Sequence, residues 1–162
     1  MAYDIIKTSD RGRLASFFIR SDGQTGGEMN GVTIIDASTL SGSLGETNAE
    51  RLRIKHVSCQ NAGVDGTTPV GGANSCIFLA FEGSVDQMAL ILPKGHTNVS
   101  PGLTCDHVDD GNIGTTTGDI ALSTGINGDE LIAFTMTITV EKYRGYRGVR
   151  PKAGMLGAIV GE

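Results

Sequence analysis

The segment 131–140 constrains the fold more than any other part of this sequence. From residue 132 onward, one side of this segment, taken as an extended chain, carries only large apolar side chains, and the other side carries alanine and threonine. The apolar residues are Ile132, Phe134, Met136, Ile138 and Val140. This strict period of two, with many β-branched residues, predicts a β-strand that packs on a core through one face. No stretch of useful length elsewhere has the 3.6-residue period of an amphipathic helix.

Further segments carry strand signals of two kinds. Residues 51–57 also alternate and place arginine and lysine on one face, which predicts a strand whose cationic face meets solvent or a partner. Residues 76–81 and 88–92 are continuous apolar runs, which predict a central hairpin that is covered on both faces. The remaining strand candidates are 13–20, 32–36 and 119–123.

The segments between these strands are rich in turn formers. Glycine makes up 24 of the 162 residues, and Asn30-Gly31 and Asn127-Gly128 are typical turn pairs. Residues 37–50 allow one helical turn. Seven or eight short strands joined by turns predict an all-β fold, a single antiparallel β-sandwich, and the jelly roll is the common eight-stranded form of that fold.

The formal net charge of −5 conceals two basic ends. Residues 1–20, the N-terminal segment with the first strand, hold four basic and two acidic residues, a balance of +2, and residues 141–162 hold five and two, a balance of +3. The sandwich body between them, residues 21–140, holds four and fourteen, a balance of −10. Such a body argues against direct nucleic-acid binding. The basic C-terminal segment either lies on a neighbouring subunit or is a solvated tail.

The composition changes at residue 141, and that of residues 141–162 predicts an extended arm. Residues 141–150 interleave arginine, glycine and tyrosine, a composition that can also bind single-stranded nucleic acid. Residues 154–161 are apolar and glycine-spaced. A solvated tail rarely gathers such side chains, so we expect this arm to dock on protein.

One acidic turn contains a candidate cation site, formed by Asp106, His107, Asp109 and Asp110. Oxygen and nitrogen ligands in a turn can hold a cation, but the spacing does not match an EF-hand loop, and a zinc site would lack its second pair of ligands. Aspartates that accept backbone hydrogen bonds in a turn explain the same pattern. We therefore expect no metal and no cofactor.

The sequence offers no catalytic constellation, so we expect that the protein is not an enzyme. Its three histidines lie outside the known catalytic motifs. The three cysteines have no C-x-x-C spacing and indicate buried free thiols in a reducing compartment. The start of the sequence has no signal-peptide pattern, and the longest apolar run is far shorter than a membrane span, so we expect no membrane contact.

Residues 110–142 carry a family resemblance. They read DGNIGTTTGDIALSTG over 110–125, continue with a Gly-Asp turn at 128–129, and end in the alternating strand. This order of a glycine-rich loop, a T-G-D-I-x-L-x-T strand, a G-D turn and a long final strand resembles the C-terminal half of small virion structural proteins of tailed bacteriophages. The similarity extends over residues 50–142, and the tail from Tyr143 has no counterpart in it.

The resemblance implies a capsid decoration (cement) protein. Such a protein is made in the host cytoplasm, binds the major capsid protein on the outside of the virion as a homo-oligomer, often a trimer, and stabilises the shell. Tyrosine and arginine dominate interface hot spots, and apolar side chains fill pockets. The expected arm contacts are Tyr143, Arg144, Tyr146, Arg147, Arg150, Met155, Leu156 and Ile159. Two alternatives stay open: a head-to-tail or tail structural subunit, and a spike module that binds glycan on the host surface.

Overall fold

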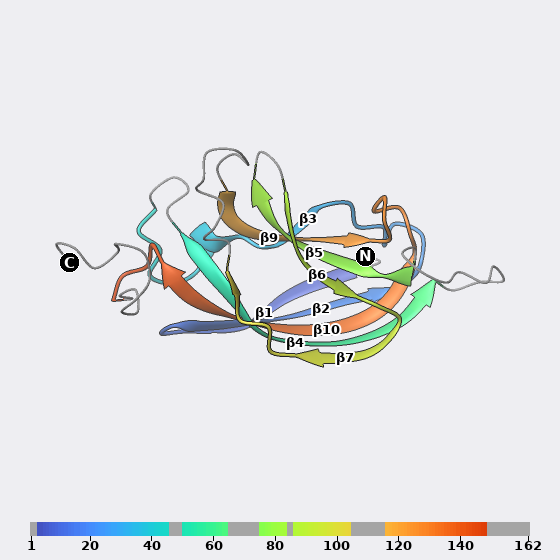
Figure 1. The fold of residues 1–162 in the computed structure, drawn as a ribbon, viewed down its shortest axis with the longest axis horizontal. Coiled ribbons are helices and arrows are strands. Elements are labelled where there is room, and N and C mark those ends of the chain that lie inside the picture. The colour runs from blue at the N-terminus through green and yellow to red at the C-terminus, as the bar shows by residue number, and fades with distance from the viewer. Residues whose placement is uncertain (1–2, 46–49, 65–74, 84–85, 105–115, 149–162) are drawn as a thin grey trace.

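The chain folds into two antiparallel β-sheets that pack face to face, as the computed structural model shows (Figure 1). The structure describes residues 3–45, 50–64, 75–83, 86–104 and 116–148. Its elements are β1 (Tyr3–Arg11), β2 (Leu14–Asp22), β3 (Val32–Ile35), the 3-10 turn η1 (Ala37–Thr39), β4 (Arg51–Val64), β5 (Ile77–Gly83), β6 (Gln87–Leu92), β7 (Gly95–Val99), β8 (Leu103–Thr104), β9 (Thr116–Thr124) and β10 (Ile132–Arg144). The all-β sandwich predicted from the sequence is therefore confirmed.

The two sheets differ in size, and the chain passes repeatedly between them. The large sheet has the order β1-β2-β10-β4-β7, with β8 also paired to β4, and the small sheet has the order β3-β9-β5-β6. The chain changes sheet after β2, β3, β4, β6, β8 and β9. As a result, the last strand, β10, lies in the middle of the large sheet between β2 and β4.

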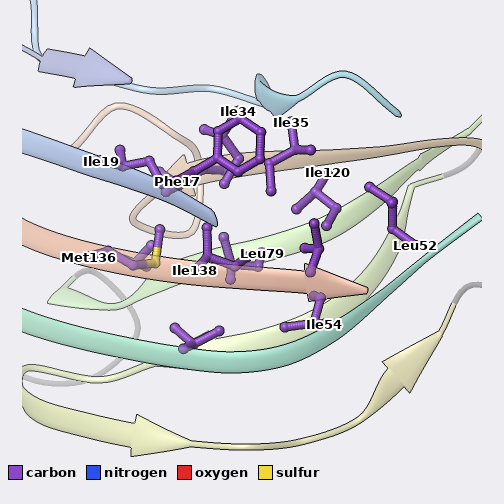
Figure 2. Packing of buried hydrophobic residues seen from close by; sticks show 14 of the residues in the cluster. Phe17, Ile19, Ile34, Ile35, Leu52, Ile54, Leu79, Ile120, Met136 and Ile138 are labelled. Atoms are coloured by element: carbon purple, nitrogen blue, oxygen red, sulfur yellow. The ribbon is translucent and has the colours of Figure 1, made fainter. Parts of the chain in front are cut away.

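The hydrophobic core fills the space between the sheets. On β10, every second residue from Ile132 to Val140 is buried, whereas Thr135 and Thr137 are exposed. Figure 2 shows the β10 side chains among residues that come from both sheets. The labelled residues are Phe17, Ile19, Ile34, Ile35, Leu52, Ile54, Leu79, Ile120, Met136 and Ile138. Burial of each large apolar side chain contributes about 1.5–3 kcal/mol, so this alternation selects the face that β10 turns inward.

The predicted strands correspond to β2, β3, β4, β5, β6, β9 and β10, and β5 and β6 form the predicted hairpin. The turn η1 lies in the segment where one helical turn was allowed. The sequence gives no clear signal for β1, β7 and β8. Strands β1 and β7 lie at the two edges of the large sheet and β8 has two residues, so these strands lack the apolar alternation of a central strand.

The prediction that both faces of the β5–β6 hairpin are covered is wrong for the described residues. Met88 and Ile91 on β6 are each 54% exposed. Ile77 and Leu79 on β5 pack into the core, while Phe78 between them points outward and is half-buried. A continuous apolar run does not reveal which of its faces is solvent-facing, because both faces carry the same kind of side chain.

Residues 141–146, which were predicted to belong to the C-terminal arm, are part of the body. Strand β10 continues to Arg144 and keeps Glu141, Lys142 and Tyr143 buried in the large sheet. Tyr146 then forms an isolated β-bridge with Ser43. The body therefore extends beyond the expected boundary, because these side chains find partners on neighbouring strands.

Gly118 on β9 provides a test of the packing between β9 and the residue that precedes β4. Gly118 has a φ of +83°, and a Cβ at this position would overlap the carbonyl oxygen of Glu50. Gly118→Ala should lower the free energy of unfolding by well over the about 1–2 kcal/mol that a positive φ alone costs an L-residue, as measured by urea denaturation. Gly26→Ala is the matched control, because Gly26 has a φ of +89° and nothing within 4 Å of its Cβ position. Equal losses in the two variants would contradict this contact.

Candidate functional site

The structure separates the predicted arm contacts into buried, exposed and undescribed residues. Tyr143 and Tyr146 are 6% and 2% exposed, so their rings are packed in the body and do not project from it. Arg144 and Arg147 are exposed at the same end of the molecule. Outside the described residues lie Arg150, Met155, Leu156 and Ile159 of the arm and Asp106, His107, Asp109 and Asp110 of the predicted cation cluster.

Lys142 on β10 is a buried cation, 1% exposed, that the sequence pattern did not single out. Its Nζ donates hydrogen bonds to Asp10 Oδ1 at 2.6 Å, to Ser41 O at 2.7 Å and to Ser41 Oγ at 2.7 Å. These contacts match the three donors of an ammonium group. Nζ also lies 5.6 Å from the centroid of the Tyr146 ring. Lys142 thereby connects β10 to β1 and to the segment that follows η1.

Asp10 on β1 supplies the countercharge for Lys142. Its carboxylate also accepts hydrogen bonds from Ser41 N and Ser41 Oγ, each at 2.8 Å, and from Lys7 Nζ at 3.2 Å. Burial opposes ionisation, but the hydrogen bonds from Lys142, Ser41 and Lys7 outweigh it and hold the pKa of Asp10 well below its usual range. Asp10 is therefore ionised at neutral pH and neutralises the buried ammonium.

Glu141, the neighbour of Lys142, is the centre of a second charge cluster on the outer face of the large sheet. Arg13 Nη2 lies 3.5 Å from its carboxylate, and Arg53 Nη1 and Lys55 Nζ each lie 3.7 Å from it. Arg53 also lies over the Tyr143 ring, 5.1 Å from its centroid. Because three cations share one carboxylate, the cluster retains a positive charge.

The pairing of β10 with β2 and β4 gathers the basic parts of the sequence into one surface. Glu141 is opposite Leu14 on β2, and Arg144 is opposite Arg51 on β4. In Figure 1 the turn between β1 and β2, the start of β4 and the end of β10 lie at the same end of the large sheet. We name the following residues the basic end: Arg11, Arg13, Arg53, Lys55, Arg144 and Arg147.

Sequence reasoning found the basic end only in pieces. The N-terminal and C-terminal basic segments and the cationic face of 51–57 were each visible as separate features. Their meeting depends on which strands pair and in which register, and the sequence gives no local signal for either. A basic side chain also gives no signal of whether it is exposed, like Arg144, or buried, like Lys142.

The described residues also bear on the expectations about metal binding, free thiols and membrane-spanning helices. Within them, no group of three or more histidine, cysteine, aspartate or glutamate side chains is placed to hold a metal ion. Cys59 is a buried free thiol, as predicted, and burial raises its pKa to about 12. Over the described ranges, the structure contains no helix of the length and apolarity needed to cross a bilayer.

Comparisons with known proteins return no match, whether to protein-family models, to curated proteins or to solved structures. The basic end is therefore interpreted from its own chemistry. Guanidinium and ammonium groups bind carboxylates and phosphates through charge-assisted hydrogen bonds. The arrangement can thus bind a surface of opposite charge.

Lys142→Met tests the buried ion pair. The substitution leaves the Asp10 carboxylate without its main countercharge, and breaking a buried pair in this way costs about 3–5 kcal/mol. Urea denaturation at pH 7 should show a loss of free energy of unfolding of that size. The double variant Asp10→Asn with Lys142→Met should recover part of the loss, because no uncompensated charge remains. A single variant as stable as the unsubstituted protein would show that the pair is not needed.

The Asp10 pKa also predicts how stability changes with pH. Because the folded-state pKa lies below the unfolded value of about 3.9, the pair contributes fully above that pH and loses its contribution as the pH falls through the folded pKa. The unsubstituted protein should therefore lose free energy of unfolding below about pH 4 more steeply than Asp10→Asn, in urea titrations repeated across acidic pH. Parallel curves for the two proteins would contradict the assignment.

Proposed function

We propose that this chain is a non-enzymatic structural protein of a tailed-bacteriophage virion, a capsid decoration (cement) protein that binds the outside of the capsid and stabilises the shell. The observation that carries this proposal is the basic end, a cationic surface on a chain whose formal net charge is −5. Arg13 and Arg53 in it are half-buried, and its other four members are exposed. Complementary charge speeds association and orients the partners. The partners are an acidic surface of the major capsid protein and further copies of this chain, as a trimer.

The strand order supports a jelly roll as the finer description of the fold. Without β1 and β8, the remaining eight strands form two sheets of four, β2-β10-β4-β7 and β3-β9-β5-β6. A jelly roll has eight strands in two sheets, and viral capsid domains are among the proteins that use it. This agreement favours a virion protein, although the fold alone does not define a function.

The C-terminal arm contributes to assembly, and the residues just before it are held in place by the body. Tyr143 and Tyr146 are packed in the body, and Arg144 and Arg147 belong to the basic end. The following residues, 149–162, carry the remaining arm contacts to neighbouring subunits. Ordering such a segment costs free energy, but it covers a large interface.

The glycan-binding alternative has less support than the decoration protein. All eight aromatic residues of the chain fall within the described ranges; five are buried and three are half-buried. None of these eight side chains is as exposed as Met88 or Ile91. A head-to-tail or tail subunit could use the same basic end, and it differs from a decoration protein in copy number.

Charge reversal tests the role of the basic end. The variant Arg144→Glu with Arg147→Glu should lose co-sedimentation with capsids of the phage that encodes the chain, because two exposed cations become anions. Arg20→Glu with Lys94→Glu is the matched control, because both side chains are exposed at the other end of the large sheet, and it should still bind. Circular dichroism should show that both variants are folded.

Equal capsid binding by the two charge variants would overturn the role of the basic end. The copy number of the chain in purified particles then distinguishes the classes of virion protein. A simple ratio to the major capsid protein supports decoration, and far fewer copies indicate a connector, tail or spike subunit. Absence of the chain from particles would overturn the proposed function as a whole.

A further inference from the structure

The outer face of the small sheet exposes an apolar surface on β5 and β6. Phe78 is paired with Ile91 across these strands, and Ala80 is paired with Met88. Met88 and Ile91 are each 54% exposed. Strand β6 forms the edge of the sheet and contains no charged residue. Exposed, uncharged edges are usually covered or protected, because they invite association. We name Phe78, Ala80, Met88 and Ile91 the apolar face.

Acidic side chains bound the apolar face at one end. Glu82 follows Ala80 on the same face of β5 and accepts hydrogen bonds from Thr33 Oγ1 at 2.8 and 3.0 Å. Burial raises the pKa of Glu82 despite this hydrogen bond, and nearby Asp119 on β9 and Asp86 raise it further. Burial likewise raises the pKa of Asp119. Because Asp119 and Asp86 raise the pKa of Glu82, a cation placed beside Glu82 favours its ionised form.

The described part of the chain ends beside these acids. The Tyr146 hydroxyl donates a hydrogen bond to Ala37 O at 2.8 Å, and Ala37 N donates one to Asp119 Oδ1, also at 2.8 Å. Arg147 N donates to Gly42 O at 2.6 Å. In Figure 1 the end of β10, the turn η1 and the start of β9 lie at one end of the molecule, where β5 ends and β6 begins. Two hydrogen bonds, through Ala37, therefore connect Tyr146, near the end of the described residues, to Asp119.

The sequence that follows is complementary to this surface. Arg150 and Lys152 are basic, and residues 153–161 contain no charge and several large apolar side chains. In an extended chain, about 13 Å separates Lys152 from Leu156. The same number of residues separates Glu82 from Phe78. If Lys152 lies beside Glu82, Leu156 can therefore reach Phe78. The 14 residues after Gly148 can extend about 46 Å, which is enough to cross the sheet.

We propose that residues 150–161 dock on the outer face of the small sheet of their own chain, with Arg150 and Lys152 at the acidic side chains and Met155 and Leu156 on the apolar face. The docked segment covers the exposed side chains of β6 in the unassembled protein. This proposal does not depend on the proposed function. It does give the arm a resting position from which the same contacts can be exchanged with a neighbouring copy, as in domain swapping.

Oxidation of Met88 by hydrogen peroxide measures whether the apolar face is covered. The rate of sulfoxide formation is followed by peptide mass spectrometry in the full chain and in a chain that ends at Gly148, at concentrations where light scattering shows monomers. Met88 should oxidise several-fold more slowly in the full chain. Met29 and Met136 are buried in the core and report whether both chains are equally folded. Equal Met88 rates would overturn the proposal, and protection that increases with protein concentration would assign the face to a second copy and overturn it as well.

Full-length charge variants test the same proposal without truncation. Arg150→Glu with Lys152→Glu should raise the Met88 oxidation rate toward that of the shortened chain, because it places anions beside Glu82 and Asp119. An unchanged rate would overturn the docking. The basic-end variant Arg144→Glu with Arg147→Glu should leave the Met88 rate unaltered, so the docking and the proposed function can fail independently.

Discussion

The position of β10 between β2 and β4 is the constraint on which the other features of the molecule depend. Its alternating side chains fill the core, and a slip of one residue in register would move that whole set from the core to the solvent. The register that buries Ile138 and Val140 also sets Glu141 beside Arg13 of the β1–β2 turn and beside the cations of β4, and it sets Lys142 next to the Tyr146 ring. Core packing therefore determines the geometry of the basic end.

The buried pair of Lys142 and Asp10 adds specificity to this arrangement. A buried ion pair contributes little net stability compared with apolar residues of similar size, whereas leaving one charge unpaired is costly. The three hydrogen bonds of Lys142 are satisfied only when β1 and the segment after η1 occupy these positions. The same region anchors Tyr146 on Ala37. The pair thus helps to fix the position of the last described residues, on which the docking proposal depends.

The sequence predicts those strands in which apolar side chains that face the core alternate with polar side chains that face solvent. The alternation in 131–140 predicts β10 and its inner face, because each outward threonine contrasts with an inward apolar residue. Edge strands such as β7 pair on one side and carry no such contrast. Tyr143 and Tyr146 fit an interface and a buried position equally well by residue type. Only the structure shows that Arg53 lies over the Tyr143 ring on the outer face and that Tyr146 belongs to the core and bonds to Ala37. The basic end required knowledge of strand pairing, which depends on contacts far apart in the sequence.

The two sheets carry opposite charges at the end of the molecule where β10 ends. The large sheet presents the basic end there, and the small sheet presents Glu82 and Asp119. The hydrophobic core separates these two charged surfaces, so each sheet can contact its own partner. One end of the molecule can thus bind an acidic surface through the large sheet while it holds a basic segment on the small sheet, a division that the net charge of −5 does not reveal.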